Sequence, residues 1–310
     1  MSIYTIIIHG GAGTILKKDM TAEKETAYNA ALDAALDAGY TLLDNGSSAT
    51  DAVRAAVCSL EDNILFNAGK GSVFTKDGIQ EMDAAIMEGH SLMAGSVAAV
   101  RNIKNPVELA YAIMTRSQHV MLMGKGAYDF ALLNDIETAP DEYFYSAFRY
   151  DQWKQMQDTD VTALDHNVVI TDKKFGTVGA VALDIQGNIA AATSTGGMTN
   201  KQYGRVGDSP VIGAGTYANN KTCAISCTGH GEPFIRAVTA YDVSCLMEYK
   251  GLSLQEAMNV VVHDKLIRLE GEGGMIGVDA KGNAAMIFNS EGMYRGMRNS
   301  NGIKEIAIYK

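Results

Sequence analysis

The sequence lacks the segments and the charge that would place it in a membrane or on a nucleic acid. No stretch approaches the ~20 apolar residues that cross a bilayer, and its start lacks the basic residues and the long apolar run of a signal peptide. The 26 Lys and Arg residues are outnumbered by 36 Asp and Glu, which gives a net charge of −10, whereas nucleic acids and anionic membranes require clustered basic residues. We therefore expect a soluble cytoplasmic protein with no nucleic-acid and no membrane partner.

Cysteine is also scarce, because 310 residues contain only Cys58, Cys223, Cys227 and Cys245. Cys223 and Cys227 lie four residues apart on a predicted strand, about 13 Å at ~3.3 Å per residue, which is too far for a disulfide. So few cysteines do not form a disulfide scaffold, in agreement with a reducing compartment. Several histidines are too scattered along the sequence to suggest a metal site: His90, His119, His166 and His263.

The pattern of apolar residues predicts alternating strands and helices. Predicted strands cover residues 3–8, 82–87, 91–100, 119–123, 177–183, 189–195, 275–278 and 284–288. Predicted helices cover residues 21–43, 47–60, 106–117, 125–134, 141–156, 231–249 and 253–269. Hairpin strands separated by paired helices are typical of an α+β domain in which helices cover antiparallel sheets. Met-rich patches such as Met121 and Met123 are interpreted as core.

Gly176 and Thr177 stand where a loose segment, 158–176, meets a predicted strand. That segment has no sustained period and is interpreted as a flexible linker. A threonine hydroxyl is a weak nucleophile unless a base removes its proton. If the bond between the two residues is cut, Thr177 gains an α-amine that titrates at about pH 7.7–8.0 and acts as a base near neutrality. One residue would then supply nucleophile and base, although a glycine that merely enters a strand is the alternative.

Further polar groups follow in the sequence. Counting across the predicted hairpin places Thr195 at the same sheet end as Thr177, where its hydroxyl can orient the nucleophile or simply bond to backbone. Arg205 and Asp208 together suit the carboxylate and the ammonium of an α-amino acid, with an exposed ion pair as the alternative. The segment 226–232 passes from a strand into a helix, a turn whose N–H groups stabilise an oxyanion or bind phosphate.

These motifs occur together in the order typical of one enzyme family. The sequence resembles the plant-type asparaginases, also called isoaspartyl peptidases, which are N-terminal-nucleophile (Ntn) hydrolases. The resemblance is carried by the segment 176–220, which reads GTVGAVALDIQGNIAAATSTGGMTNKQYGRVGDSPVIGAGTYANN, and by the segments 9–13, 60–69 and 226–232. It covers nearly the whole chain and is weakest over 138–174.

The resemblance implies a four-layer αββα sandwich of the Ntn-hydrolase type, formed as a single fold by residues 1–310. It implies that the precursor cleaves itself after Gly176 into an α chain, 1–176, and a β chain, 177–310. Two such αβ heterodimers are expected to pair. The expected substrates are small molecules, asparagine and β-aspartyl (isoaspartyl) dipeptides, from which the enzyme would release aspartate.

The resemblance also assigns roles to single residues. Thr177 would be the nucleophile, and the Thr195 hydroxyl would lie next to it. The expected binding residues are Arg205 for the substrate α-carboxylate, Asp208 and Gly231 for its α-amine, and Thr228 and Gly229 for the oxyanion.

No cofactor is expected for catalysis, but the resemblance implies a structural sodium ion. Hard cations bind oxygen ligands, and a sodium ion would be held by backbone carbonyls of one loop. The expected ligands are Leu60, Glu61, Asn63, Phe66, Ala68 and Lys70; a plain turn without a bound ion is the alternative.

Three other functions remain open at the level of the sequence. An aspartylglucosaminidase would share the nucleophile but usually belongs to a secretory compartment. A threonine endopeptidase would share it too but needs a more open site. A non-catalytic module that binds anionic metabolites would use the same glycine-rich turns and would not cleave itself.

Overall fold

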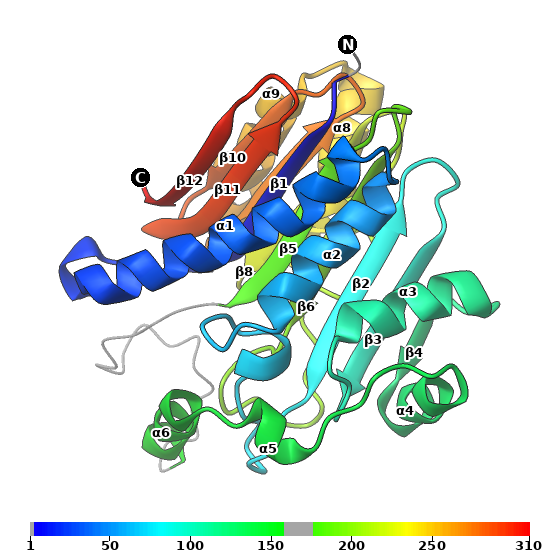
Figure 1. Cartoon of the computed structure of the whole chain (residues 1–310). Helices are drawn as coiled ribbons and strands as arrows, with labels where there is room; N and C mark the ends of the chain where they lie inside the picture. The colour runs from blue at the N-terminus through cyan, green and yellow to red at the C-terminus, as the bar shows by residue number, and fades with distance from the viewer. Residues whose placement is uncertain (1–2, 158–175) are drawn as a thin grey trace.

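The computed structural model describes residues 3–157 and 176–310, which form a mixed α/β protein with two β-sheets (Figure 1). The strands are β1 Thr5–Gly13, β2 Met82–Glu88, β3 Ala94–Val100, β4 Met121–Met123, β5 Thr177–Leu183, β6 Ile189–Thr195, β7 Thr216–Ala218, β8 Cys223–Gly229, β9 Gly273–Asp279, β10 Ala284–Phe288, β11 Gly292–Asn299 and β12 Lys304–Tyr309. The larger sheet has eight strands in the order β12-β11-β1-β5-β6-β2-β3-β4, and the smaller has four in the order β10-β9-β8-β7. The predicted linker, 158–176, lies outside the described residues except for Gly176.

The long helices cover the two sheets. The helices are α1 Ala22–Asp44, α2 Ala49–Glu61, α3 Pro106–Arg116, α4 Gly124–Leu133, α5 Asp141–Phe144, α6 Ala147–Met156, α7 Gly231–Ala237, α8 Thr239–Lys250, α9 Leu254–Asn259 and α10 Leu266–Arg268. α1 packs on β1 and β11, α2 on β5 and β6, and α3 on β2 and β3. β8 and β9 of the smaller sheet pack on β5 and β1 of the larger one, and α8 and α9 pack on the smaller sheet. In Figure 1, α1 and α2 lie in front of the larger sheet, and α8 and α9 lie behind it.

β1 lies between β5 and β11, near the middle of the larger sheet, and is buried on both faces. Successive side chains of a strand point to opposite faces. Ile6 and Ile8 accordingly belong to the hydrophobic core under the helices, and Ile7 belongs to the core between the two sheets. Burial of one such side chain contributes roughly 1.5–3 kcal/mol. The unbroken apolar run at the start of the sequence therefore reflects a strand with a core on each side.

The strand continues further than the sequence predicts. A loop is expected from His9 onward, but β1 runs to Gly13 with a β-bulge after His9. A Cβ on Gly10 would lie only 2.4 Å from the Phe66 ring. The absence of a side chain at Gly10 lets this aromatic ring pack directly on the backbone of the strand.

The predicted starts of the first two helices are confirmed. Thr21 caps α1 and Ser48 caps α2, each with its side-chain oxygen accepting a backbone N–H. The two long helices predicted over 231–249 and 253–269 are each interrupted. Val238 adopts a left-handed conformation, φ 49°, between α7 and α8, and a π-helical stretch follows α9.

One prediction about the core is wrong. Met121 and Met123 are expected to be buried, but they are 45% and 63% exposed. Among the described residues, β4 is a three-residue strand at the edge of the larger sheet and has β3 as its single neighbour. The prediction of no disulfides is confirmed, since all four cysteines are free. No helix in the described part of the chain is long and apolar enough to cross a membrane.

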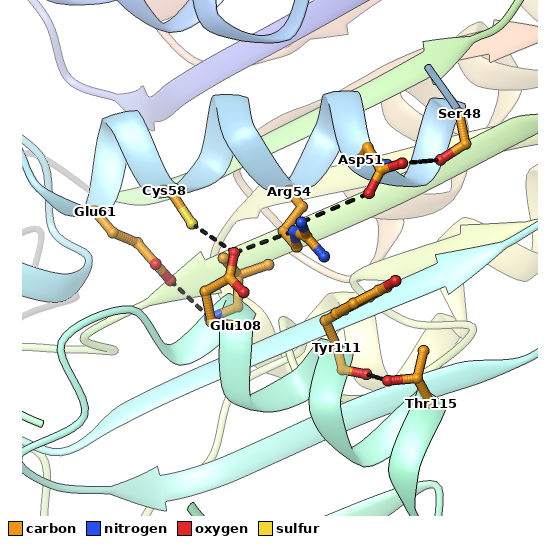
Figure 2. Close-up of polar contacts among 9 residues, drawn as sticks. Ser48, Asp51, Arg54, Cys58, Glu61, Glu108, Tyr111 and Thr115 are labelled. Atoms are coloured by element: carbon orange, nitrogen blue, oxygen red, sulfur yellow. Dashed lines mark hydrogen bonds and ion pairs between the residues drawn. The ribbon is translucent and has the colours of Figure 1, made fainter. Parts of the chain in front are cut away.

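Polar contacts hold the end of α2 against the start of α3 (Figure 2). The buried Glu61 carboxylate accepts the Val107 backbone N–H at 3.1 Å, and the Cys58 thiol lies 3.3 Å from Glu108. Arg54 completes the cluster with an ion pair to Glu108, at 3.1 Å. Burial raises the pKa of Glu61 to about 8. These contacts fix the point at which the chain leaves α2 and turns toward the site described below.

Candidate active site

Three strands bring their predicted site residues to the same end of the two sheets. Thr177 begins β5 and Thr195 ends β6, and the antiparallel register places these two residues opposite each other. This confirms the count across the hairpin. β8, in the facing sheet, ends at Gly229 and packs against β5 and β6.

The hydroxyl groups of the two threonines are in contact with the peptide bond before Thr177. Thr177 Oγ1 donates to Thr195 Oγ1 at 3.3 Å, and Thr195 Oγ1 donates to the Gly176 carbonyl at 3.1 Å. The Gly197 N–H also donates to Thr195 Oγ1, at 2.9 Å. The Thr195 hydroxyl therefore donates a hydrogen bond to the Gly176 carbonyl and accepts one from the Thr177 hydroxyl at the same time.

Asn67 fixes the backbone that follows Thr195, a role that sequence reasoning missed. Its side-chain Nδ2 donates to the Gly197 carbonyl at 2.7 Å, and its backbone carbonyl accepts the Gly196 N–H at 2.9 Å. A Cβ on Gly176 would lie 2.2 Å from the Asn67 side chain. Glycine before Thr177 is thus required by the close approach of Asn67, and this contact between distant segments leaves no local signal in the sequence.

A small recess, with a volume of about 40 Å³, opens beside the two threonines. Its walls are formed by Asn67, Val73, Gly176, Thr177, Thr195, Gly197, Met198, Thr199, Arg205, Gly207, Asp208, Ser209 and Gly229. Of the predicted catalytic and substrate-binding residues, Thr228 and Gly231 are missing from this wall.

Those two residues lie directly behind it. Thr228 is fully buried, and its Oγ1 accepts the Ala12 N–H at 3.2 Å. A Cβ on Gly231 would lie 2.9 Å from an Arg205 nitrogen and 3.0 Å from an Asp208 oxygen. Gly231 therefore allows both charged residues to approach the start of α7.

Arg205 is held by a partner that sequence reasoning did not assign. Its Nε and Nη2 donate to the two carboxylate oxygens of Glu232, each at 2.9 Å, and His230 lies 3.2 Å from the same carboxylate. Partial burial opposes ionisation of Glu232, but the hydrogen bonds from His230 and Arg205 prevail and hold its pKa well below the usual range. The bidentate pair fixes the plane of the guanidinium. Because Glu232 lies 27 residues from Arg205 in the sequence, no local pattern predicts that the two side chains pair.

Asp208 is buried and only partly satisfied. Its side chain is 4% exposed, and within the described part of the chain Oδ2 has no hydrogen-bond partner. Burial raises the pKa of Asp208 to about 6, although the nearby Arg205 charge acts in the opposite direction. An unpaired carboxylate that lines a recess is a ready partner for a cationic group.

The loop expected to hold sodium is folded tightly on itself. The carbonyls of Leu60, Asn63 and Ala68 accept backbone N–H groups within the loop at 3.2–3.3 Å. The Glu61 carbonyl lies 2.4 Å from where a Cβ would stand on Gly69. Carbonyl oxygens are of the ligand type that hard cations bind, and the same hydrogen bonds are those of a plain turn. Among residues 3–157 and 176–310, no cluster of three acidic, His or Cys side chains offers a site for another kind of metal.

The fold and the recess together define a candidate threonine hydrolase for a small charged substrate. Comparison with known proteins agrees with this class. The chain belongs to the asparaginase family, whose model, described as Asparaginase, matches residues 2–308.

Named relatives extend across bacteria and animals. The chain is 50% identical over 307 residues to the isoaspartyl peptidase of Escherichia coli, which covers 98% of this chain and 96% of the relative. It is 49% identical to the isoaspartyl peptidase of Salmonella typhimurium, with 100% of both chains covered. It is 41% identical to the isoaspartyl peptidase/L-asparaginase of Bos taurus, with 93% of this chain and 91% of the relative covered.

The Asp208→Asn substitution tests whether the ionised, buried carboxylate lowers the free energy of unfolding. The folded pKa, about 6, exceeds the ordinary value of 3.8, so this residue destabilises the native state increasingly as the pH rises through that interval. The free energy of unfolding of the variant, relative to the parent, should rise by about 2–3 kcal/mol between about pH 4.5 and 8. Denaturant unfolding at several pH values measures this difference.

Asp184 supplies a matched control. It is also buried, but its two carboxylate oxygens accept the N–H groups of Ala49, Gln186 and Asn188. Asp184→Asn should therefore lower stability at neutral pH, where Asp208→Asn raises it. If the difference in unfolding free energy between Asp208→Asn and the parent did not change with pH, ionisation of Asp208 would not destabilise the protein and the prediction would be wrong.

Proposed function

We propose that the protein is an autoprocessing threonine hydrolase that releases aspartate from β-aspartyl dipeptides and from L-asparagine. The observation that carries this proposal is the Thr195 hydroxyl, in contact with both the Thr177 hydroxyl and the Gly176 carbonyl. The names of the relatives, isoaspartyl peptidase and isoaspartyl peptidase/L-asparaginase, support this choice of substrates.

The proposal includes the architecture and the division of the chain. The packing of helices on the outer faces of two facing sheets supports a four-layer αββα sandwich of the Ntn-hydrolase type. Self-cleavage would yield an α chain, 1–176, and a β chain, 177–310, that remain in one fold. Two such heterodimers are the expected assembly.

Self-cleavage begins with attack of Thr177 Oγ1 on the Gly176 carbonyl carbon. The new C–O bond forms as the Gly176–Thr177 C–N bond breaks, and the hydroxyl proton passes to the departing nitrogen. Thr195 donates to the carbonyl oxygen as negative charge develops there. Water then hydrolyses the ester, leaving a carboxylate on Gly176 and a free α-amine on Thr177.

In turnover, the α-amine of Thr177 takes the proton of its own hydroxyl as Oγ1 attacks the β-carbonyl of the substrate. That proton passes to the departing amine or ammonia as the amide C–N bond breaks. Backbone groups at Thr228 and Gly229 are the expected donors to the oxyanion. Water hydrolyses the resulting β-aspartyl ester and releases aspartate.

The charged residues of the recess select the substrate in this proposal. Arg205 binds the α-carboxylate, and Asp208 binds the α-ammonium, with Gly231 close to both. Glu232 holds the guanidinium in a fixed plane, so that the substrate carboxylate meets an oriented cation. Fixing both groups of the aspartyl head directs the β-carbonyl, rather than the α-carboxylate, toward Thr177.

Two related activities and one different class compete with this assignment. An aspartylglucosaminidase or a threonine endopeptidase would share the nucleophile, but the relatives above carry neither name. A non-catalytic metabolite-binding module would leave the Gly176–Thr177 bond intact. The test of self-cleavage below distinguishes that module from every enzyme considered.

Thr177→Ala should abolish both processing and turnover, because it removes the attacking oxygen. A denaturing gel and mass spectrometry should show one uncut chain of 33.1 kDa with no hydrolysis of β-aspartyl-leucine. Thr177→Ser is the matched control and should still cleave. Two bands from the alanine variant would refute the assigned nucleophile.

Arg205→Ala should impair substrate capture more than chemistry. Loss of a charge-assisted hydrogen bond costs about 1.5–3 kcal/mol, which predicts a rise in KM of about ten- to 150-fold with a smaller change in kcat. Steady-state kinetics on β-aspartyl-leucine measures both constants. Lys265→Ala, which breaks an ion pair with Asp242 between α8 and the π-helical stretch, should leave KM unchanged; an unchanged KM for Arg205→Ala would disprove its role.

Sodium should stabilise the protein if the loop carbonyls bind it. A ligand that binds only the native state raises the unfolding temperature, so we expect a rise of about 2 °C or more in sodium chloride over tetramethylammonium chloride. Gly69→Ala should remove this rise, since its Cβ would meet the Glu61 carbonyl. Gly302 also has positive φ but open space around it, and Gly302→Ala should keep the rise. Equal unfolding temperatures in the two salts would count against the site.

A further inference from the structure

We propose that a buried chain of hydrogen bonds from His9 through Ser226 and Thr193 to Thr216 positions Thr177 relative to the head-group loop. These four residues act as positioning residues, which do not touch the substrate. The inference rests on the proposed function, because it concerns how the nucleophile and the charge-binding residues are held in one geometry.

The chain is continuous and crosses both sheets. His9 Nδ1 lies 3.0 Å from the Thr177 carbonyl oxygen, and His9 Nε2 lies 2.9 Å from Ser226 Oγ. Ser226 Oγ lies 2.7 Å from Thr193 Oγ1, and Thr193 Oγ1 lies 2.7 Å from Thr216 Oγ1. The residues come from β1, β5, β6, β7 and β8. No single sheet could supply this path.

The far end of the chain reaches the loop that carries the predicted α-amine ligand. Thr216 has one hydroxyl proton, which is shared between Thr193 Oγ1 at 2.7 Å and the Ser209 carbonyl oxygen at 3.0 Å. Ser209 follows Asp208, and both residues line the recess. The chain therefore links the backbone of the nucleophile to the backbone beside the head-group carboxylate.

The Thr177 carbonyl fixes the direction of the protons near His9. A carbonyl oxygen only accepts hydrogen bonds, so Nδ1 of His9 must carry the ring proton. Complete burial lowers the pKa of His9 to about 3, so the ring stays neutral near pH 7 and Nε2 accepts the Ser226 proton. Thr193 then donates to Ser226 at 2.7 Å, with the Gly215 carbonyl as a more distant acceptor at 3.3 Å. Loss of the Ser226 hydroxyl therefore removes a hydrogen-bond partner of the buried His9 Nε2.

A glycine two residues after Thr177 leaves room for this chain of hydrogen bonds. Gly179 lies opposite Thr193 in the β5–β6 register. A Cβ on Gly179 would lie 2.0 Å from Ser226 Oγ and 2.4 Å from His9 Nε2. The contact between the imidazole and the serine occupies the space that any other residue would fill with its side chain.

The rival explanation is that these hydroxyls only stabilise the fold. The protein contains a matched pair for this comparison, since Thr222 and Ser244 also form a buried hydroxyl–hydroxyl contact of 2.7 Å. Neither residue lines the recess or belongs to the chain. Ser226→Ala and Ser244→Ala each break one buried contact between a serine and a threonine hydroxyl, and Ser226→Ala also removes the partner of His9 Nε2. A purely structural role therefore predicts a larger loss of stability for Ser226→Ala, but unchanged processing and unchanged kcat in the folded protein for both variants.

The experiment compares these two variants with the parent protein. Mass spectrometry follows the appearance of the two chains, and kcat and KM for β-aspartyl-leucine are measured per processed site. Displacement of a reacting group by about 1 Å costs up to 100-fold. We expect Ser226→Ala to slow processing and to lower kcat by roughly ten- to 100-fold, while KM changes little and Ser244→Ala matches the parent in all three. Equal rates for the two variants would overturn the inference.

Thr193 provides the second test, which holds even if Ser226→Ala does not fold. Thr193→Val removes the hydroxyl with little change of shape and should slow both processing and turnover. Thr193→Ser keeps the hydroxyl and should restore most of the rate. If the serine variant is as slow as the valine variant, the hydroxyl is not what matters and the inference is wrong. A parent protein that never cleaves would instead refute the proposed function together with this inference.

Discussion

The Thr195 hydroxyl accepts a hydrogen bond from the Thr177 hydroxyl and donates one to the Gly176 carbonyl, and the organisation of the site depends on these two contacts. They exist because antiparallel register brings the first residue of β5 opposite the last residue of β6. Asn67 then fixes the turn after Thr195 from a loop more than a hundred residues earlier in the chain. A hydroxyl with one donated and two accepted bonds is well satisfied despite its burial, so the geometry is held without an unpaired polar group.

The charged groups of the recess, in contrast to the Thr195 hydroxyl, are not all fully hydrogen-bonded. Nε and Nη2 of Arg205 bind Glu232, whereas Asp208 is buried and its Oδ2 has no hydrogen-bond partner among the described residues. An incompletely paired carboxylate destabilises a folded protein. Such a cost is expected at a binding site, because a substrate ammonium can supply the missing partner. The stability of the free protein and the capture of the substrate therefore place opposing demands on the same residue.

Close packing at glycine connects the nucleophile to the rest of the molecule. The backbone of Gly176 lies against Asn67, and that of Gly179 lies against the contact between His9 and Ser226. In both places another part of the chain fills the space of a side chain. Three distant segments therefore determine the conformation from Gly176 to Gly179. The four-residue motif alone does not specify this geometry.

The sequence alone indicated most of the helices and strands and the end of the sheet at which the polar groups gather, but it did not predict β11 and β12. Caps at Thr21 and Ser48, the hairpin that pairs Thr177 with Thr195, and the separation of the cysteines are local properties, readable from spacing. The partners of those groups were decided only by tertiary structure. Asn67, Glu232 and the buried chain from His9 meet the site across long stretches of sequence, and the exposure of Met121 depends on its place at a sheet edge. Local patterns specify which face or end a residue occupies, but contacts between distant segments arise only when the layers pack.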